Sequence, residues 1–304
     1  MIVLDVQNLT KVYTGDLFKP KSTALGGISI AVQQGEIFGF LGQNGAGKTT
    51  TLKIIMGLNR STSGAVTIFG KPVDDVSVRA QVGYLPEHPY FYDYLTATEF
   101  MTLYARLFGL RRFDPAPLLA RVGLEAARHQ RLRRFSKGML QRVGIAQALI
   151  NDPALLILDE PMSGLDPSGR RLVRDLILDL KARGKTVFFS SHIISDVEAM
   201  CDRIAILHRG QICAAGRIDE LLHGPHRRIT VSGVGANARQ VLAAAGHPAT
   251  ETAEGLTFVA LSEEAVWVIL DHVRKAGGAV VAIVDGRPAL ETFFMQTIAD
   301  KAAA

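Results

Sequence analysis

A glycine-rich segment between two apolar runs constrains this chain more than any other part of it. Residues 42–50 read GQNGAGKTT; the apolar run 37–41 precedes them and LKIIM, at 52–56, follows. The order strand, glycine loop, helix predicts a phosphate-binding loop, because glycines let backbone N–H groups approach phosphate oxygens. The helix start adds the positive end of its dipole. A glycine-rich turn with a chance lysine is the simpler alternative.

Two side chains of this loop are expected to bind the phosphates and the metal ion directly. We expect Lys48 to reach the β- and γ-phosphates of a nucleotide and the Thr49 hydroxyl to hold Mg²⁺. The candidate nucleotide-binding residues are Gly42, Gln43, Asn44, Gly45, Ala46, Gly47, Lys48, Thr49 and Thr50.

Two other apolar runs end in residues that can do chemistry. Residues 155–161 read LLILDEP, as a buried parallel strand would. Asp159 stands where an acid that organises Mg²⁺ belongs, and Glu160, one residue further, can orient and deprotonate a water. Acids at a strand end can also simply begin a turn. The run 186–191 ends at His192, for which we expect a hydrogen bond to a γ-phosphate rather than the structural role that lone histidines usually have.

Two further positions are open to more than one interpretation. Tyr13 follows the first predicted strand, and its ring could stack on a purine or be an ordinary exposed tyrosine. Ser136 is a good N-cap for a helix that runs through Ile150. That helix start is either a second anion-binding end or a simple capped helix. Spacing alone leaves both questions open.

The pattern of elements predicts an α/β fold with two domains. Alternating segments at 2–9, 28–32 and 65–69 predict a small antiparallel sheet beside the main one. A mostly helical insertion is expected at about 88–150. We expect a first domain over residues 1–225, and a small α+β domain, of split-βαβ type, over 226–304.

Charge and hydropathy limit the partners. The chain has 304 residues with 34 basic and 29 acidic side chains, a balance that does not by itself indicate DNA. Cys201 and Cys213 lack metal or redox spacing, so free thiols are expected. We expect no signal peptide, and no apolar run is long enough to span a bilayer. Any membrane role is therefore expected to come through a partner.

With these residues in view, residues 1 to about 224 closely resemble the ATP-binding subunit of an ABC transporter. The motifs that carry the resemblance occur in the family's order. They are the A-loop aromatic Tyr13, the Walker A loop 42–50, the Q-loop position Glu87, the signature FSKGM at 135–139, the Walker B strand 155–160, the D-loop SGLD at 163–166 and the switch His192.

The resemblance implies a P-loop NTPase fold with a mixed central sheet, an antiparallel β subdomain and a helical insertion. It also implies two copies docked head to tail, with each ATP between one Walker A loop and the partner's signature. Ser136, Lys137, Gly138 and Met139 would thus act on the partner's ATP, and Asp166 would belong to the D-loop. Separate membrane permease subunits would convert ATP-driven closure into transport, at the cytoplasmic face of the membrane.

Two departures from the family pattern indicate a branch. Glu87 replaces the commoner glutamine, yet its carboxylate can still approach Mg²⁺ beside Thr49 and Asp159. In the signature, Lys137 and Met139 replace glycine and glutamine. Both changes resemble the branch that pairs with ABC-2 type exporters, and the tail from about 226 resembles that branch's accessory domain. Export is therefore the expected direction.

Other classes of function remain open at this stage. A soluble ABC ATPase acting on nucleic acid or ribosomes is disfavoured, because no sustained heptads or second cassette occur and no specific nucleic acid is expected. A nucleotide-regulated binding module without turnover is disfavoured by Glu160. We expect an ATPase that uses ATP and Mg²⁺.

Overall fold

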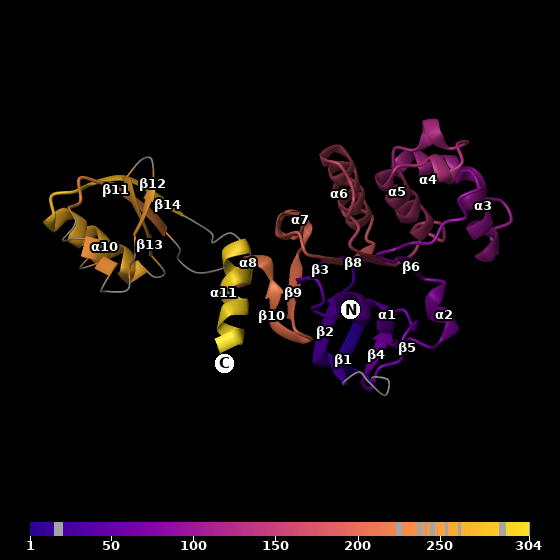
Figure 1. Cartoon of the computed structure of the whole chain (residues 1–304), viewed down its shortest axis with the longest axis horizontal. Coiled ribbons are helices and arrows are strands. Elements are labelled where there is room, and N and C mark those ends of the chain that lie inside the picture. Colours follow the sequence, from indigo (N-terminus) through magenta and orange to yellow (C-terminus); the bar gives the residue numbers. More distant parts are fainter. Residues whose placement is uncertain are drawn as a thin grey trace. The chain divides into compact units, whose positions relative to one another are not determined.

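The structure is a computed structural model of residues 1–304 (Figure 1). It describes residues 1–14, 21–222, 227–235, 239–240, 242–243, 247, 249–252, 255–260, 263–285 and 290–303. The chain forms two compact units, Met1–Ile218 with Thr297–Ala304, and Asp219–Gln296. The domain boundary expected between residues 225 and 226 lies outside the described residues.

A six-stranded mixed sheet forms the centre of the first unit. Its order is β10-β9-β3-β8-β7-β6, in which only β10 runs antiparallel to its neighbour. The bounds are β3 Ile37–Gly42, β6 Val82–Leu85, β7 Leu155–Asp159, β8 Thr186–Ser191, β9 Arg203–His208 and β10 Gln211–Arg217. Every residue of β3, β7 and β8 is buried, as their apolar runs predict. Because these three strands are parallel, their carboxyl ends meet at one edge of the sheet.

A second, antiparallel sheet has the order β2-β1-β4-β5 and confirms the predicted β subdomain. Its strands are β1 Ile2–Tyr13, β2 Ser22–Gln33, β4 Ser63–Ile68 and β5 Lys71–Pro72. One cluster of buried residues joins this sheet to the central one and to α1 (Lys48–Ile55), including Leu4, Val32, Phe40 and Leu52. The helix that follows the glycine loop is therefore held between two sheets.

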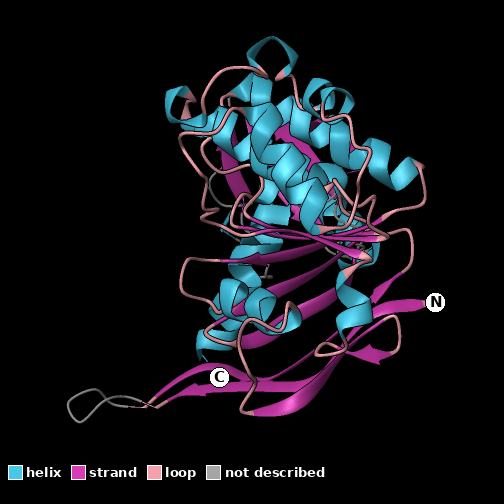
Figure 2. Ribbon diagram, turned by 90° about the vertical axis from the view of Figure 1, so that its right-hand side faces the viewer, coloured by secondary structure: helices cyan, strands magenta, loops and turns pink. Residues whose placement is uncertain are grey.

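The helices of this unit lie mainly on the other side of the central sheet. Figure 1 shows α3, α4, α5 and α6 there, with α1 and the antiparallel sheet opposite, and Figure 2 shows this helical layer from the side. The bounds are α2 Val76–Arg79, α3 Ala97–Leu107, α4 Ala116–Arg121, α5 Lys137–Ala148, α6 Pro167–Ala182, α7 Ile194–Met200 and α8 Ile218–Leu221. Short α2 was not predicted.

The predicted capping serine is confirmed, because Ser136 Oγ accepts the Met139 N–H at 3.2 Å.

The second unit contains a four-stranded sheet of order β12-β13-β11-β14, with every neighbouring pair antiparallel. The elements are β11 Arg227–Ser232, β12 Ala249–Thr252, β13 Gly255–Ala260, α10 Glu263–Lys275 and β14 Ala279–Asp285. This order is that of the predicted split-βαβ arrangement, although β12 was not predicted. The helix predicted at 236–245 lies largely outside the described residues. The last helix, α11, spans Leu290–Ala303.

Across the part of the chain that the structure describes, no helix combines the length and the apolar character that crossing a membrane requires.

Candidate nucleotide-binding site

The glycine loop connects β3 to α1 at the carboxyl edge of the central sheet. Gly45 has φ 79° and Gly47 has φ 113°, a left-handed region that glycine adopts without strain. A Cβ on Gly47 would lie 2.7 Å from the Ala24 carbonyl oxygen, and a Cβ on Gly42 would lie 2.6 Å from that of Leu207. The loop is therefore packed so closely that larger residues at 42 and 47 would displace it.

A cavity of about 200 Å³ opens above this loop. It is lined by Ala24, Gln43, Asn44, Gly45, Gly47, Lys48, Thr49, Thr50, Glu87 and Glu160. Four segments of the chain thus meet here, namely β2 at Ala24, the glycine loop with the start of α1, the segment after β6 at Glu87 and the residue after β7, Glu160. The strand ends predicted that the loop and Glu160 would meet, whereas the site role expected for Glu87 came from the family resemblance.

The ammonium of Lys48 is surrounded by three oxygen atoms. Nζ donates to the Gly42 carbonyl oxygen at 2.7 Å and to that of Gln43 at 3.4 Å, and it lies 3.2 Å from Oε1 of Glu160. Both side chains of the ion pair are buried. An ammonium has three donors, so phosphate oxygens at the loop would compete with these same acceptors.

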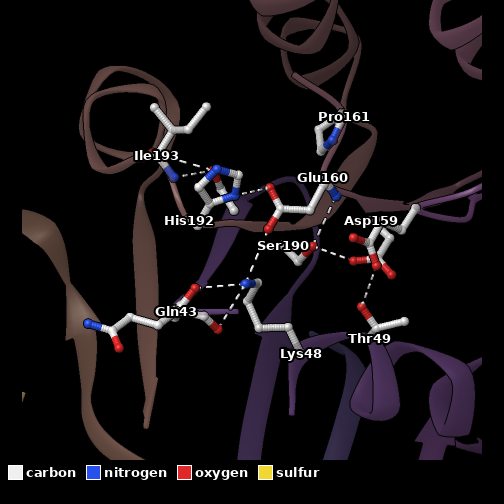
Figure 3. A network of polar contacts seen from close by, with 12 residues as sticks. Gln43, Lys48, Thr49, Asp159, Glu160, Pro161, Ser190, His192 and Ile193 are labelled. Atoms are coloured by element: carbon white, nitrogen blue, oxygen red, sulfur yellow. Dashed lines mark hydrogen bonds and ion pairs between the residues drawn. The ribbon is translucent and has the colours of Figure 1, made fainter. Parts of the chain in front are cut away.

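The carboxylate of Glu160 lies between the side chains of Lys48 and His192 and contacts both (Figure 3). Besides Lys48, it contacts His192, whose Nδ1 lies 2.8 Å from Oε2. An ionised carboxylate only accepts hydrogen bonds, so Nδ1 carries the hydrogen. The two residues that the sequence placed at one sheet edge are therefore in direct contact.

The main chain around Glu160 is held by two residues to which sequence analysis gave no role. Glu160 has φ 52°, a left-handed conformation that costs a non-glycine residue roughly 1–3 kcal/mol. Its N–H donates to Ser190 Oγ at 3.0 Å, and Gln141 Nε2 donates to the carbonyl oxygens of Glu160 and Pro161, both at 3.2 Å. A polar residue within the fully buried strand 186–191 was the signal that could have identified Ser190.

Asp159 is fully buried and precedes Glu160 in the chain. Its Oδ1 accepts from Ser190 Oγ at 2.6 Å, whereas Oδ2 has no hydrogen-bond partner among the described residues. Burial raises the pKa of the Asp159 carboxyl above its ordinary value; the hydroxyls of Ser190 and Thr49 lower it, and the nearby charges of Glu87 and Glu160 raise it. A buried oxygen without a partner, in a carboxyl with this environment, is a place for a cation.

The oxygen atoms around Thr49 fit a magnesium ion that is shared with phosphates. Thr49 Oγ1 donates to Oε2 of Glu87 at 3.2 Å, next to Asp159. Within the described residues, no cluster of three or more His, Cys, Asp or Glu forms a complete protein-only metal site. Mg²⁺ does not need one, since it usually takes one or two carboxylates together with phosphate and water oxygens.

Comparison with known proteins identifies the family. Residues 25–163 match the sequence profile described as ABC transporter. An uncharacterized ABC transporter ATP-binding protein of Nostoc sp. is 46% identical over 303 residues, which cover 97% of this chain and 90% of that protein. The chain belongs to the ABC transporter ATP-binding proteins. As a member of that family, it is an ATP-hydrolysing subunit of a transporter.

Two other similarities add detail to this ABC membership. A fluoroquinolones export ATP-binding protein of Mycobacterium tuberculosis is 42% identical over 231 residues, 74% of each chain. A solved dimeric ATP-binding cassette in a post-hydrolysis state, bound to ADP and Pi, matches with a TM-score of 0.66 and 26% identity. That match covers 71% of this chain and 98% of the solved one, so the ABC cassette fold is shown.

The signature and D-loop of this ABC protein lie against each other, outside the cavity lining. The Ser136–Met139 segment begins α5, and the Lys137 side chain packs over Gly164, where an added Cβ would lie 2.8 Å from Cε. Asp166 caps α6, because its Oδ1 accepts the Gly169 N–H at 3.1 Å. The signature residues therefore do not take part in lining the cavity of the glycine loop.

Tyr13, the predicted A-loop residue, does not line the cavity, and neither do the candidates Gly42, Ala46, Asp159 and His192. Tyr13 ends β1 with 40% of its surface exposed. Its Oη accepts from Asn59 Nδ2 at 3.4 Å, and Lys11 Nζ lies 4.9 Å from the ring centroid. Its role as an adenine platform stays a prediction.

Proposed function

We propose that this chain is the motor subunit of an ABC exporter, in which ATP-driven closure of two copies powers translocation through separate membrane subunits. The observation that carries this proposal is the position of Glu160, which contacts both Lys48 and His192 and lines the cavity of the glycine loop. ATP hydrolysis needs three groups close together: a base, a lysine that binds phosphate, and a side chain that donates a hydrogen bond to the γ-phosphate.

The reaction uses these side chains in a defined order. The loop amides and Lys48 hold the triphosphate, and Glu160 orients a water and takes its proton as the oxygen attacks the γ-phosphorus. The bond between that phosphorus and the oxygen bridging to the β-phosphate breaks, and ADP leaves. In its doubly protonated form, His192 donates from both ring nitrogens, so it can bind Glu160 and the γ-phosphate together.

A magnesium ion completes the proposed site. Thr49, Asp159 and Glu87 would hold it, and the unpartnered Asp159 Oδ2 supports that assignment. When bound, Mg²⁺ neutralises charge that develops on the phosphate oxygens during transfer. The protein's own contribution is to keep these three oxygen-bearing side chains together at the loop.

In this proposal, a second copy of the chain contributes residues to each ATP site. Ser136, Lys137, Gly138 and Met139 lie at the start of α5 and do not line the cavity formed by the described residues. A head-to-tail dimer would place them on the partner's ATP, with Asp166 beside the interface. The dimeric state of a solved ABC cassette supports this arrangement.

Export and a position at the cytoplasmic face of the membrane are the finer parts of the proposal. They are supported by the name of the mycobacterial relative and by the exporter-like residues Glu87, Lys137 and Met139. The membrane subunits would be permeases on separate chains, which also choose the cargo.

Co-purification of the tagged full chain tests this function. In mild detergent, we expect an integral membrane protein to be retained and to raise the rate of ATP hydrolysis. Retention of ribosomes or DNA, with no membrane protein, would instead support a soluble ABC ATPase and contradict the transport role.

A further inference from the structure

Gln141 is a buried polar residue that the reaction described above does not use. It lies in the second turn of α5, and only 6% of its surface is exposed. Its Nε2 donates to two successive carbonyl oxygens, those of Glu160 and Pro161, at 3.2 Å each. A buried amide requires hydrogen-bond partners, and here both bonds from Nε2 go to the main chain that carries the proposed base.

That main chain needs support, because Glu160 has φ 52°. A left-handed non-glycine residue persists only where surrounding contacts hold it. Ser190 holds the N–H side of Glu160, and Gln141 holds the carbonyl side together with the next peptide. With the backbone fixed at both sides, the carboxylate projects back toward Lys48 and His192.

The helix that carries Gln141 is itself firmly seated. A Cβ on Gly144 would lie 2.6 Å from Leu85 Cδ1, so α5 approaches β6 as closely as a glycine allows. The neighbouring Arg142 donates from Nη1 to the Val122 carbonyl oxygen at 3.0 Å and to that of Gly123 at 3.2 Å. Gln141 therefore acts from an anchored helix rather than from a mobile loop.

We propose that Gln141 is a positioning residue for ATP hydrolysis, which keeps the strained backbone at Glu160 in the conformation that delivers its carboxylate to the site. This inference rests on the proposed function, in which Glu160 is the base. Gln141 does not line the cavity of the glycine loop, so its role concerns the rate of the chemical step and not nucleotide binding.

The test compares Gln141→Met, an unbranched side chain without donors, with Gln147→Met as a matched control in the same helix. Gln147 is partly buried at the other end of α5 and lines a different cavity. In the full-length protein, we expect Gln141→Met to lower kcat roughly tenfold or more, because small misplacements of catalytic groups are costly. The Kd for ATP should stay within about twofold, and the control should change neither quantity by more.

A double-mutant cycle shows whether Gln141 acts through Glu160. In a Glu160→Gln background, residual single-turnover hydrolysis should not fall further on adding Gln141→Met, since the group that Gln141 positions is already lost. Multiplying losses would overturn the proposal, as would a folded Gln141→Met with wild-type kcat, or an equal loss of affinity and rate.

If Gln141→Met does not fold, Gln141→Leu takes its place, because it also removes both donors and adds no charge to the buried site. A roughly tenfold loss of kcat at unchanged Kd supports the proposal, and wild-type kcat overturns it. The wild-type rate separates the two levels of inference. If the wild-type chain does not hydrolyse ATP, the proposed function fails; if it does and the Gln141 variants match it, only the positioning role fails.

Discussion

Nζ of Lys48 lies 3.2 Å from Oε1 of Glu160, so the loop lysine and the proposed base form a buried ion pair. A triphosphate brings oxygens that compete for the same ammonium. Binding would therefore draw Lys48 toward phosphate and leave the Glu160 carboxylate able to accept a proton from water. The pair links nucleotide binding to the availability of the base.

Removing the lysine should affect both binding and stability. We expect Lys48→Ala to weaken ATP affinity about 100-fold, since a charge-assisted contact to the phosphates is lost. The nucleotide-free protein should also lose roughly 3 kcal/mol of unfolding free energy, because Glu160 becomes a buried charge without its partner lysine. Nucleotide titration and denaturant unfolding measure these effects. Lys53→Ala, an exposed lysine of the same helix, is the control, and equal behaviour of the two variants would contradict this role.

The carboxyl of Asp159 should make the protein less stable at neutral pH. Its pKa is raised above the ordinary 3.8, chiefly by burial, so the folded protein holds this proton more tightly than the unfolded chain does. Between 3.8 and the raised value, unfolding releases the proton, and stability falls as pH rises through that window. We expect Asp159→Asn to raise the Tm at neutral pH in metal-free buffer and to lose magnesium-dependent hydrolysis.

Asp166→Asn provides the opposite case. The pKa of Asp166 is lowered by the Ser168 hydroxyl and the Gly169 N–H, so its contribution to stability is present at neutral pH and is lost as pH falls. Its replacement should lower the Tm at neutral pH. A lower Tm for Asp159→Asn as well, measured across the same pH series, would contradict the account of the buried carboxyl.

The C-terminal part should be dispensable for nucleotide binding. Every residue that lines the cavity of the glycine loop precedes residue 161. We therefore expect a chain ending at residue 225 to bind ATP with a Kd within about twofold of the full chain, by the additivity of distant sites. Calorimetric titration of both proteins measures this. A folded truncated chain without affinity for ATP would show that the tail completes the site.

The apolar runs were sufficient to predict the sheet edge on which the site stands. Residues 37–41, 155–159 and 186–191 are buried in parallel neighbouring strands, so their chemistry-bearing ends had to meet. The glycines of the loop were equally informative, because close backbone approach at Gly42 and Gly47 admits no side chain.

The supporting contacts could not be predicted in the same way. Gln141 and Ser190 reach the Glu160 backbone across 19 and 30 residues of sequence, and a helical or strand pattern does not specify which buried polar group meets which carbonyl. Short β12 and α2 were missed because four residues carry too little periodicity to register. Tyr13 could be placed at a strand end, but its distance from the cavity depends on tertiary packing.

The most direct test of Glu160 as the base is single-turnover hydrolysis of Mg²⁺·ATP by the Glu160→Gln variant and by the wild-type chain. The oligomeric state of both proteins is measured in the same samples. The account predicts that the wild type hydrolyses ATP, and that the variant is slower by roughly 100-fold or more while ATP still holds it as a dimer. A Glu160→Gln protein that releases phosphate at the wild-type rate would contradict the assignment of the base.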